Sequence, residues 1–219
     1  MSIVPTSFFS RDSCAVACDL LGKIIRHNYR GKWLAAQIIE TEAYYLTDKG
    51  SHASLGYTQK RAALFMPAGT IYMYYARGRD SINVSCEGEG NAVLIKSAYP
   101  YEDKQTDPQA LELMQASYAT PRPVARLCAG QTLLCQALYL KLPQWNQQQF
   151  HPEHLFIDDV GYHPDKIVQT RRLGIPIGRD EHLPYRFIDL DFVEFCTSNP
   201  LRKRGLQEGS DYLIMSRNH

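Results

Sequence analysis

The segment "IIETEAY", residues 38–44, joins strand-forming residues to two glutamates and a tyrosine. Successive side chains of a β-strand alternate between its two faces, so Glu40, Glu42 and Tyr44 are expected on one face and the residues between them on the other. A carboxylate beside a tyrosine ring suits a general base that activates water next to a flat bound group. The alternative is that both glutamates lie on a solvated sheet face, because glutamate is mostly a surface residue.

Two carboxylates on one strand are also compatible with a glycoside hydrolase. The Cα atoms of Glu40 and Glu42 would lie about 6.6 Å apart on a strand, which fits the carboxyl separations that such enzymes use. Nucleophile and acid usually approach the sugar from opposite sides, however, and neighbours on one strand face do this poorly. This hypothesis also leaves Tyr44 without a role.

The order of strand and helix patterns indicates an α+β fold, because strands come in consecutive runs and helices are set apart. We expect one domain, residues 1–219, with a curved, mostly antiparallel sheet and surrounding helices. Ser10 is expected to cap the first helix, Gly22 to end it, and Pro184 to place the start of the last strand at a sheet edge. The expected helices are at 10–21, from 107 and after 130, and the expected strands are at 23–28, 33–44, 70–76, 81–86, 92–98 and within 183–195. Residues 45–69 are expected to form a loop, and residues 141–170 to be irregular.

Composition limits the classes of function. The 219 residues are 44% hydrophobic and carry a net charge of +1, so any nucleic-acid surface has to be local. The six cysteines include no CxxC pair, no secretory signal is evident, and no stretch approaches the roughly 20 apolar residues that span a bilayer. We therefore expect a cytoplasmic protein with reduced cysteines and no membrane partner.

A second strand supplies further aromatic rings. In "TIYMYYA", residues 70–76, Tyr72 and Tyr74 share one face. Two aromatic-bearing strands that close on each other would form a slot for a flat ring, although aromatic cross-strand packing within a sheet is an equally common arrangement.

Polar clusters give weaker signals. Residues 151–163 contain His151, His154, Asp158, Asp159 and His163, but no spacing matches a zinc signature, so we predict no metal. Short basic groups could contact phosphates or be solvated surface; they are Arg77 with Arg79, Arg122 with Arg126, Arg171 with Arg172, and residues 202–204.

Taken in order, several segments resemble the alkyladenine (3-methyladenine) DNA glycosylase family over nearly the whole chain. They are "LLGKII" (20–25), "IIETEAY" (38–44), His52, "FMPAGTIYMYY" (65–75), "INVSCEGEGNAVLIKSAYP" (82–100), "LCAGQTLLCQAL" (127–138) and "LPYRF" (183–187). Enzymes of this family flip a damaged purine out of duplex DNA and cleave its N-glycosidic bond, because the bond is shielded inside the base stack.

The resemblance implies a role for individual residues. Glu42 would be the general base for the attacking water, with Lys96 helping to hold that water. Tyr44 and His52 would form one wall of the base pocket and Tyr74 the opposite wall, while Asn83 would exclude undamaged guanine. Glu40 would be a supporting or partly exposed residue. The resemblance implies no metal or other cofactor, and double-stranded DNA containing damaged bases as the partner of a monomer that associates with the nucleoid when bound.

Some positions depart from the family pattern. The family usually has arginine where this chain has Lys96, and the aromatic wedge that fills the gap in the duplex is replaced by "ARGRDS", residues 76–81. Arg77 is our candidate for the wedge, with Ala76 and Arg79 as alternatives, since arginine both stacks on bases and grips phosphates. These changes support a second hypothesis, a lesion-binding protein with weak or no cleavage, or with a shifted substrate.

Overall fold

The structure is a computed structural model that describes residues 2–217. Its strands form one sheet in which every ladder between named strands is antiparallel, which confirms the predicted α+β class. The strands are β1 (Ile24–Tyr29), β2 (Lys32–Tyr44), β3 (Ile71–Ala76), β4 (Arg79–Ser85), β5 (Ala92–Pro100), β6 (Leu155–Asp158), β7 (Lys166–Thr170), β8 (Arg186–Asp189) and β9 (Tyr212–Ser216).

The long strand β2, which contains the "IIETEAY" segment, is the centre of the sheet. Along one edge it pairs with β5, and along the other it pairs first with β1 and then with β8. The main strand order is β3-β4-β5-β2-β8-β7-β9, and β6 joins through β1. The predicted strand at 33–44 is therefore confirmed, and its end lies where three strands meet.

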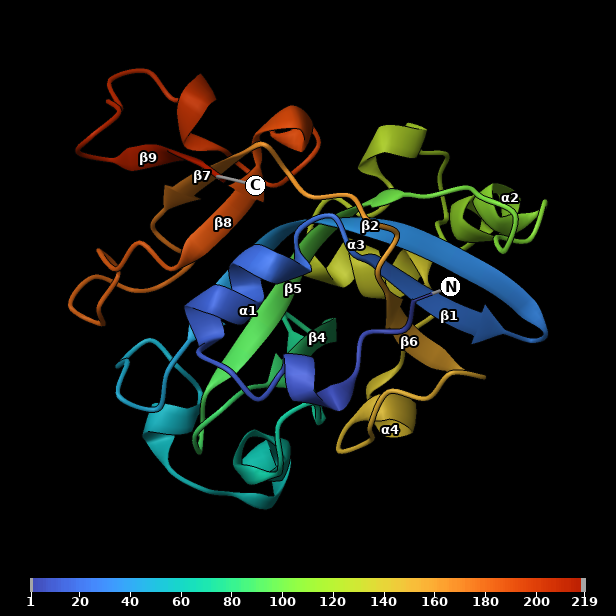
Figure 1. Cartoon of the computed structure of the whole chain (residues 1–219), viewed down its shortest axis with the longest axis horizontal. Helices are drawn as coiled ribbons and strands as arrows, with labels where there is room; N and C mark the ends of the chain where they lie inside the picture. Colours follow the sequence, from blue (N-terminus) through green and yellow to red (C-terminus); the bar gives the residue numbers. More distant parts are fainter. Residues whose placement is uncertain (1, 218–219) are drawn as a thin grey trace.

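Helices cover both faces of this sheet. In Figure 1, α1 lies in front of the strands and α3 behind them. The α-helices are α1 (Ser13–Leu20), α2 (Ala110–Ala116), α3 (Gln131–Ala137) and α4 (Leu142–Trp145), and short 3-10 helices span Thr6–Phe8, Ala53–Leu55, Gln59–Phe65, Val124–Arg126, Leu190–Phe192 and Pro200–Arg202. None of the helices within residues 2–217 has the length and apolar character that a bilayer crossing requires.

The first helix differs from the prediction at its start. Asp12, not Ser10, is the N-cap, and its carboxylate accepts a hydrogen bond from the Ala15 N–H at 3.0 Å. Gly22 follows the helix with a φ of +85°, as its predicted role as a stop requires, and a Cβ there would lie 2.4 Å from Tyr162. The N-cap therefore lies later in the chain than predicted, while the helix ends where Gly22 indicated.

The prediction that residues 141–170 are irregular was wrong. This segment contains α4, β6 and β7, and the two strands form by pairing with β1 and with β8 and β9. Strands of four or five residues carry little periodic signal, so long-range pairing decides their structure. Similarly, β8 lies in the interior of the sheet, between β2 and β7. Pro184 does not prevent this, because the strand begins two residues beyond it. The edge position expected for this strand was wrong.

Candidate functional site

A row of paired residues carries the predicted site across the sheet. On β3 and β4, Tyr72 is the register partner of Asn83. Asn83 in turn is paired with Leu94 on β5, and Leu94 with Glu42 on β2. Side chains in register share a sheet face, so residues more than 40 positions apart in the sequence converge on one side of the sheet.

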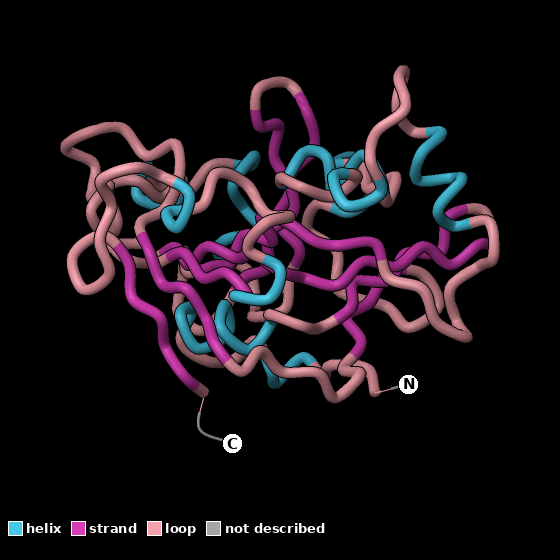
Figure 2. The backbone as a smooth tube through the Cα atoms, turned by 90° about the horizontal axis from the view of Figure 1, so that it is seen from above, coloured by secondary structure: helices cyan, strands magenta, loops and turns pink. Residues whose placement is uncertain are grey.

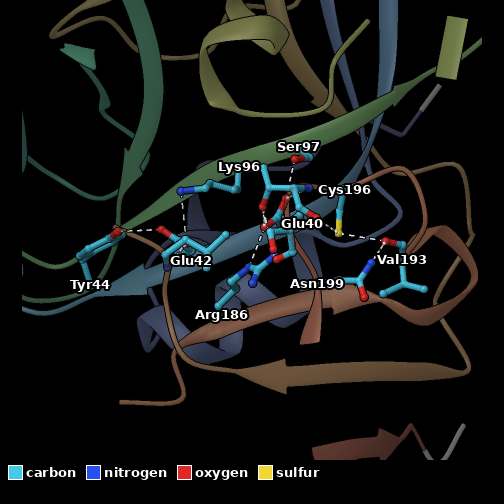
Figure 3. Close-up of polar contacts among 12 residues, drawn as sticks. Glu40, Glu42, Tyr44, Lys96, Ser97, Arg186, Val193, Cys196 and Asn199 are labelled. Atoms are coloured by element: carbon cyan, nitrogen blue, oxygen red, sulfur yellow. Dashed lines mark hydrogen bonds and ion pairs between the residues drawn. The ribbon is translucent and has the colours of Figure 1, made fainter. Parts of the chain in front are cut away.

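Glu42 is buried and fully hydrogen-bonded. It has no solvent exposure, and one carboxylate oxygen accepts the Leu173 N–H at 3.0 Å while the other accepts the Tyr44 hydroxyl at 2.7 Å (Figure 3). The Lys96 ammonium lies 3.3 Å from the first oxygen. A buried carboxylate requires such partners, and the solvated-face alternative for Glu42 is therefore excluded.

Lys96 reaches Glu42 because both strands are irregular here. The β2–β5 register shifts twice, so that Ile39 on β2 and Lys96 on β5 have no paired residue, while Ser97 is opposite Glu40 and Ile95 opposite Thr41. A bulge of this kind redirects a side chain beside a functional site. Lys96 consequently follows Leu94 on the side of the sheet that faces the site.

A cavity of about 690 Å³ lies on this side of the sheet and is open to solvent. Residues from β2 to β5 line it together with the loop at Ser51–His52, the start of α3 at Gln131 and the segment Leu173–Pro176. Among the predicted site residues, those that line the cavity are Tyr44, His52, Tyr74, Arg77, Arg79, Asn83 and Lys96. Glu42 is not a lining residue, but its carboxylate contacts two that are, Tyr44 and Lys96.

The aromatic rings are grouped differently in the structure than in the prediction. His52 lies against Tyr74, with ring centroids 4.4 Å apart and planes at 70°, and its Nδ1 is 3.0 Å from the Tyr72 hydroxyl. Tyr72 and Tyr74 are stacked at 5.7 Å. His52 therefore belongs with Tyr74 rather than with Tyr44, because the loop that carries it folds over β3. Tyr72, which sequence reasoning placed on this face without a role, also lines the cavity.

Protonation states in the cavity follow from its partial burial. Desolvation raises the pKa of Tyr44, and the adjacent Glu42 carboxylate raises it further. Desolvation likewise raises the pKa of Tyr74. Contact with the tyrosines desolvates His52 and lowers its pKa, and Arg61 and Arg179 lower it further. The rings are therefore uncharged at neutral pH.

Arg172 supports Tyr44 from behind, and the sequence had indicated only a surface or phosphate-binding role for it. Its guanidinium carbon lies 4.5 Å from the Tyr44 ring centroid, and Nη1 donates to the Ala43 carbonyl at 2.9 Å and to Asp48 at 2.8 Å. The side chain is buried, whereas Arg171 is exposed. No sequence signal separates these two arginines, because the partners that bury Arg172 lie about 125 residues away in the chain.

Glu40 belongs to a second buried network. The Arg186 Nε donates to it at 2.6 Å, and Ser97 and Thr197 also donate to its carboxylate (Figure 3). Burial alone would raise the pKa of Glu40, but Arg186 and these hydroxyls lower it. Glu40 is fully buried, so the expectation of partial exposure was wrong. Because Arg186 holds this carboxylate in a buried ion pair, it is not free to act as the second carboxylate of a glycoside hydrolase.

The basic residues at 77 and 79 lie on an exposed hairpin. Arg77 and Gly78 form its tip with φ values of +51° and +77°, and Arg77 and Arg79 are both exposed. Figure 2 shows the β3–β4 hairpin standing out from the body of the molecule at the top of the view. Both arginines also border the cavity.

The histidine-rich segment is divided by the fold. His151, Glu153 and His154 have potential ligand atoms within 4.8 Å of one another, and all three residues are exposed. Asp158 and Asp159 instead pair with Arg26 and Lys23. The six cysteines are free.

Comparison with known proteins agrees with this geometry. Residues 7–191 match the family model described as methylpurine-DNA glycosylase. The chain belongs to this family. A Pseudomonas aeruginosa (strain LESB58) protein named "Putative 3-methyladenine DNA glycosylase" is 60% identical over 216 residues, which cover 97% of this chain and 90% of the relative. Proteins with the same name from Pseudomonas syringae pv. tomato and Methanoculleus marisnigri are 62% and 34% identical, over 95% and 84% of this chain and 95% and 93% of the relatives.

Membership of the methylpurine-DNA glycosylase family supports a role in DNA repair with DNA as the substrate.

Proposed function

We propose that the protein is a DNA glycosylase that everts an alkylated or otherwise damaged purine from duplex DNA and hydrolyses its N-glycosidic bond with water activated by Glu42. Base removal uses water rather than an enzyme amine as the nucleophile, which is the monofunctional mode. The proposed enzyme acts as a monomer in the cytoplasm and is associated with the nucleoid while bound to DNA.

The observation that carries this proposal is the Glu42 carboxylate, buried directly behind the wall of an aromatic cavity. Its two oxygens are held by the Leu173 N–H and the Tyr44 hydroxyl, and Lys96 lies beside it. A general base has to be rigidly held, and a desolvated carboxylate also stabilises positive charge that develops nearby. Tyr44 and Lys96, which both contact Glu42, also line the cavity, so we place the attacking water beside them.

The cavity suits a flat, positively charged base. Tyr44 is on one side, and His52 packs on Tyr74 on β3. Electron-rich rings favour stacking with a cationic alkylated purine. Asn83, only 5% exposed, donates its amide to the Tyr72 carbonyl at 3.2 Å and is fixed where it can crowd the edge of a purine. We therefore assign the base pocket to these four side chains.

The bond changes are those of a hydrolysis. The oxygen of the activated water bonds to C1′ as the bond from C1′ to the purine nitrogen breaks, and the electron pair of that bond leaves with the base. Glu42 takes a proton from the water. An alkylated purine that carries positive charge departs as a neutral molecule, so its departure needs no added proton. The uncharged rings of the pocket are consistent with this requirement.

The second hypothesis, a lesion-binding protein with weak or no cleavage, is supported by the Lys96 and "ARGRDS" departures. A direct test separates the two. Glu42→Gln keeps the shape of the side chain and removes the base, so base release from methylated duplex DNA should fall at least about 100-fold while binding to the lesion survives. The exposed Glu112→Gln is the matched control. If the unaltered protein releases no free base from any alkylated duplex, the binding hypothesis replaces the enzyme.

A further inference from the structure

Lys96 places a primary amine inside the cavity. Of the described lysines, it alone lines the cavity, and its side chain is 11% exposed. Its partner is Glu42, at 3.3 Å, and the described residues offer it no second hydrogen bond. An arginine here would hold the same carboxylate but keeps its proton, whereas a lysine amine can form a covalent imine with a carbonyl carbon.

The position of Lys96 relative to the sugar follows from the proposed function, on which this inference rests. Water held by Glu42 attacks C1′, so C1′ has to face this carboxylate. The Lys96 ammonium lies beside the same carboxylate, at the end of a flexible four-carbon chain. After the base has left, C1′ belongs to a hemiacetal that opens to an aldehyde, and this carbon then faces Lys96.

Base removal itself keeps water as its nucleophile, as in the monofunctional mode. We propose that Lys96 adds a separate activity on DNA that has already lost its base, a lyase reaction that proceeds through an imine between its Nζ and C1′. The substrate class is DNA with an aldehydic abasic sugar, whether formed in the same cavity or met there as damage. Glu42 serves both reactions, as the base for water in the first and as the proton relay for Lys96 in the second.

Every step of this reaction balances without an added oxidant or cofactor. Glu42 accepts a proton from the Lys96 ammonium, and the free amine bonds to C1′ of the aldehyde. The nitrogen passes one proton to the oxygen to give a carbinolamine, and its hydroxyl takes the proton held by Glu42 and leaves as water, which forms a protonated imine. Glu42, again a carboxylate, takes a proton from C2′; the electrons of that bond form a double bond between C2′ and C3′ as the C3′–O bond breaks, and the 3′ phosphate departs with the electron pair of that bond. Hydrolysis of the imine frees Lys96.

The test uses the full chain and a duplex in which a single uracil has been removed beforehand to leave an abasic site. Because the abasic site is supplied, the result does not depend on base release by this protein. Borohydride reduction of the mixture should trap a covalent protein–DNA adduct, and peptide mass analysis should place the modified residue at Lys96. Without borohydride, the strand should be cut on the 3′ side of the abasic sugar.

The variants separate the cavity amine from surface amines. Lys96→Arg keeps the positive charge and removes the nucleophile, so both the adduct and strand cleavage should be lost. Lys166→Arg changes an exposed lysine on β7 and should leave both unchanged. An adduct that persists in Lys96→Arg, or that maps to another residue, overturns the proposal. Base release without any trapped adduct also overturns it, while the proposed glycosylase remains. Trapping at Lys96 without base release supports the lyase proposal and contradicts the proposed glycosylase.

Discussion

Tyr44 is positioned by a residue that does not touch the cavity. Arg172 lies under its ring, and the N–H of the next residue, Leu173, binds Glu42. One short segment after β7 therefore holds both the aromatic wall and the carboxylate. The cation is itself neutralised by Asp48, which is 5% exposed.

The ion pair between Arg172 and Asp48 leads to a prediction about stability. Arg172→Met leaves the Asp48 carboxylate buried without its partner, so the free energy of unfolding should fall by about 3–5 kcal/mol. Urea unfolding measures the loss. Adding Asp48→Asn should recover part of it, because the uncompensated charge is then removed. If the double variant loses as much free energy of unfolding as Arg172→Met and Asp48→Asn lose together, the ion pair is not what stabilises this segment.

Tyr74 is predicted to contribute to lesion binding by stacking. Tyr74→Ala should weaken binding to a duplex with a single damaged base by about 1–3 kcal/mol, the range for one aromatic stack. Its neighbour Tyr75 points to the opposite side of β3 and is 56% exposed, so Tyr75→Ala is a matched control. Fluorescence anisotropy with a labelled duplex measures both. Equal affinities for the two variants would remove Tyr74 from the pocket wall.

At the scale of residues, sequence reasoning succeeded where the period of a strand places side chains. Glu42 and Tyr44 follow from the alternation of β2, and Tyr74 from that of β3. Arg172 and Leu173 did not follow, since their contacts with β2 join segments about 130 residues apart. Which of two adjacent arginines is buried depends on that contact alone.

At the scale of elements, long strands were predictable and short ones were not. β2, β3 and β5 have enough residues for an alternating pattern to be recognised. The paired bulges at Ile39 and Lys96 had no such signal, because a bulge is a property of two strands together. This is also why the sequence placed Lys96 in the site by family resemblance and not by periodicity.

The turn at Pro176–Arg179 is an element whose exposure the proposed function explains. Ile177 at its tip is 93% exposed, although Pro176 and Arg179 on either side line the cavity. The turn is braced, since the Arg179 N–H donates to the Pro176 carbonyl at 3.1 Å and the Gly178 N–H to Glu181 at 2.8 Å. A nucleotide in the cavity would bring the neighbouring duplex against this tip.

We therefore predict that Ile177 packs against bases beside the everted nucleotide, while Arg77 remains the candidate for the wedge that fills the gap in the duplex. Ile177→Ser should weaken lesion-duplex binding by about 1–2 kcal/mol, within the value of burying one such side chain, without changing thermal stability. Leu213→Ser, at a half-exposed position on β9, is the control. A 2-aminopurine placed beside the lesion should report less unstacking with Ile177→Ser. Unchanged affinity and unchanged fluorescence would contradict the contact.

At the scale of the whole molecule, a net charge near zero hides an uneven distribution of the basic residues. The exposed Arg77 and Arg79 border the cavity, and Arg179 lies there without a carboxylate partner among the described residues. Elsewhere, arginines such as Arg26 and Arg186 are buried in ion pairs. The sum of charges therefore says little about DNA binding, whereas their position relative to the cavity does.

Buried carboxylates also make the free energy of unfolding depend on pH, and Asp189 is the clearest example. Burial raises the pKa of this carboxyl to about 6, against about 3.9 in an unfolded chain. The folded protein thus holds a proton that the unfolded chain releases. The stabilisation from this proton is complete below about pH 3.9 and is lost as pH rises through about 6.

Replacing Asp189 should remove this dependence. Asp189→Asn retains an oxygen that can accept the Asp191 N–H at the start of the following 3-10 helix. Relative to the unaltered protein, its free energy of unfolding should rise by about 2–3 kcal/mol between pH 4 and pH 7, whatever constant offset the new amide introduces. Urea unfolding across this range measures the slope, and the exposed Glu208→Gln should show no such change. A difference that stays constant with pH would mean that Asp189 is already ionised in the folded protein at pH 4, with Tyr162 and the Asp191 N–H sufficient to hold the charge.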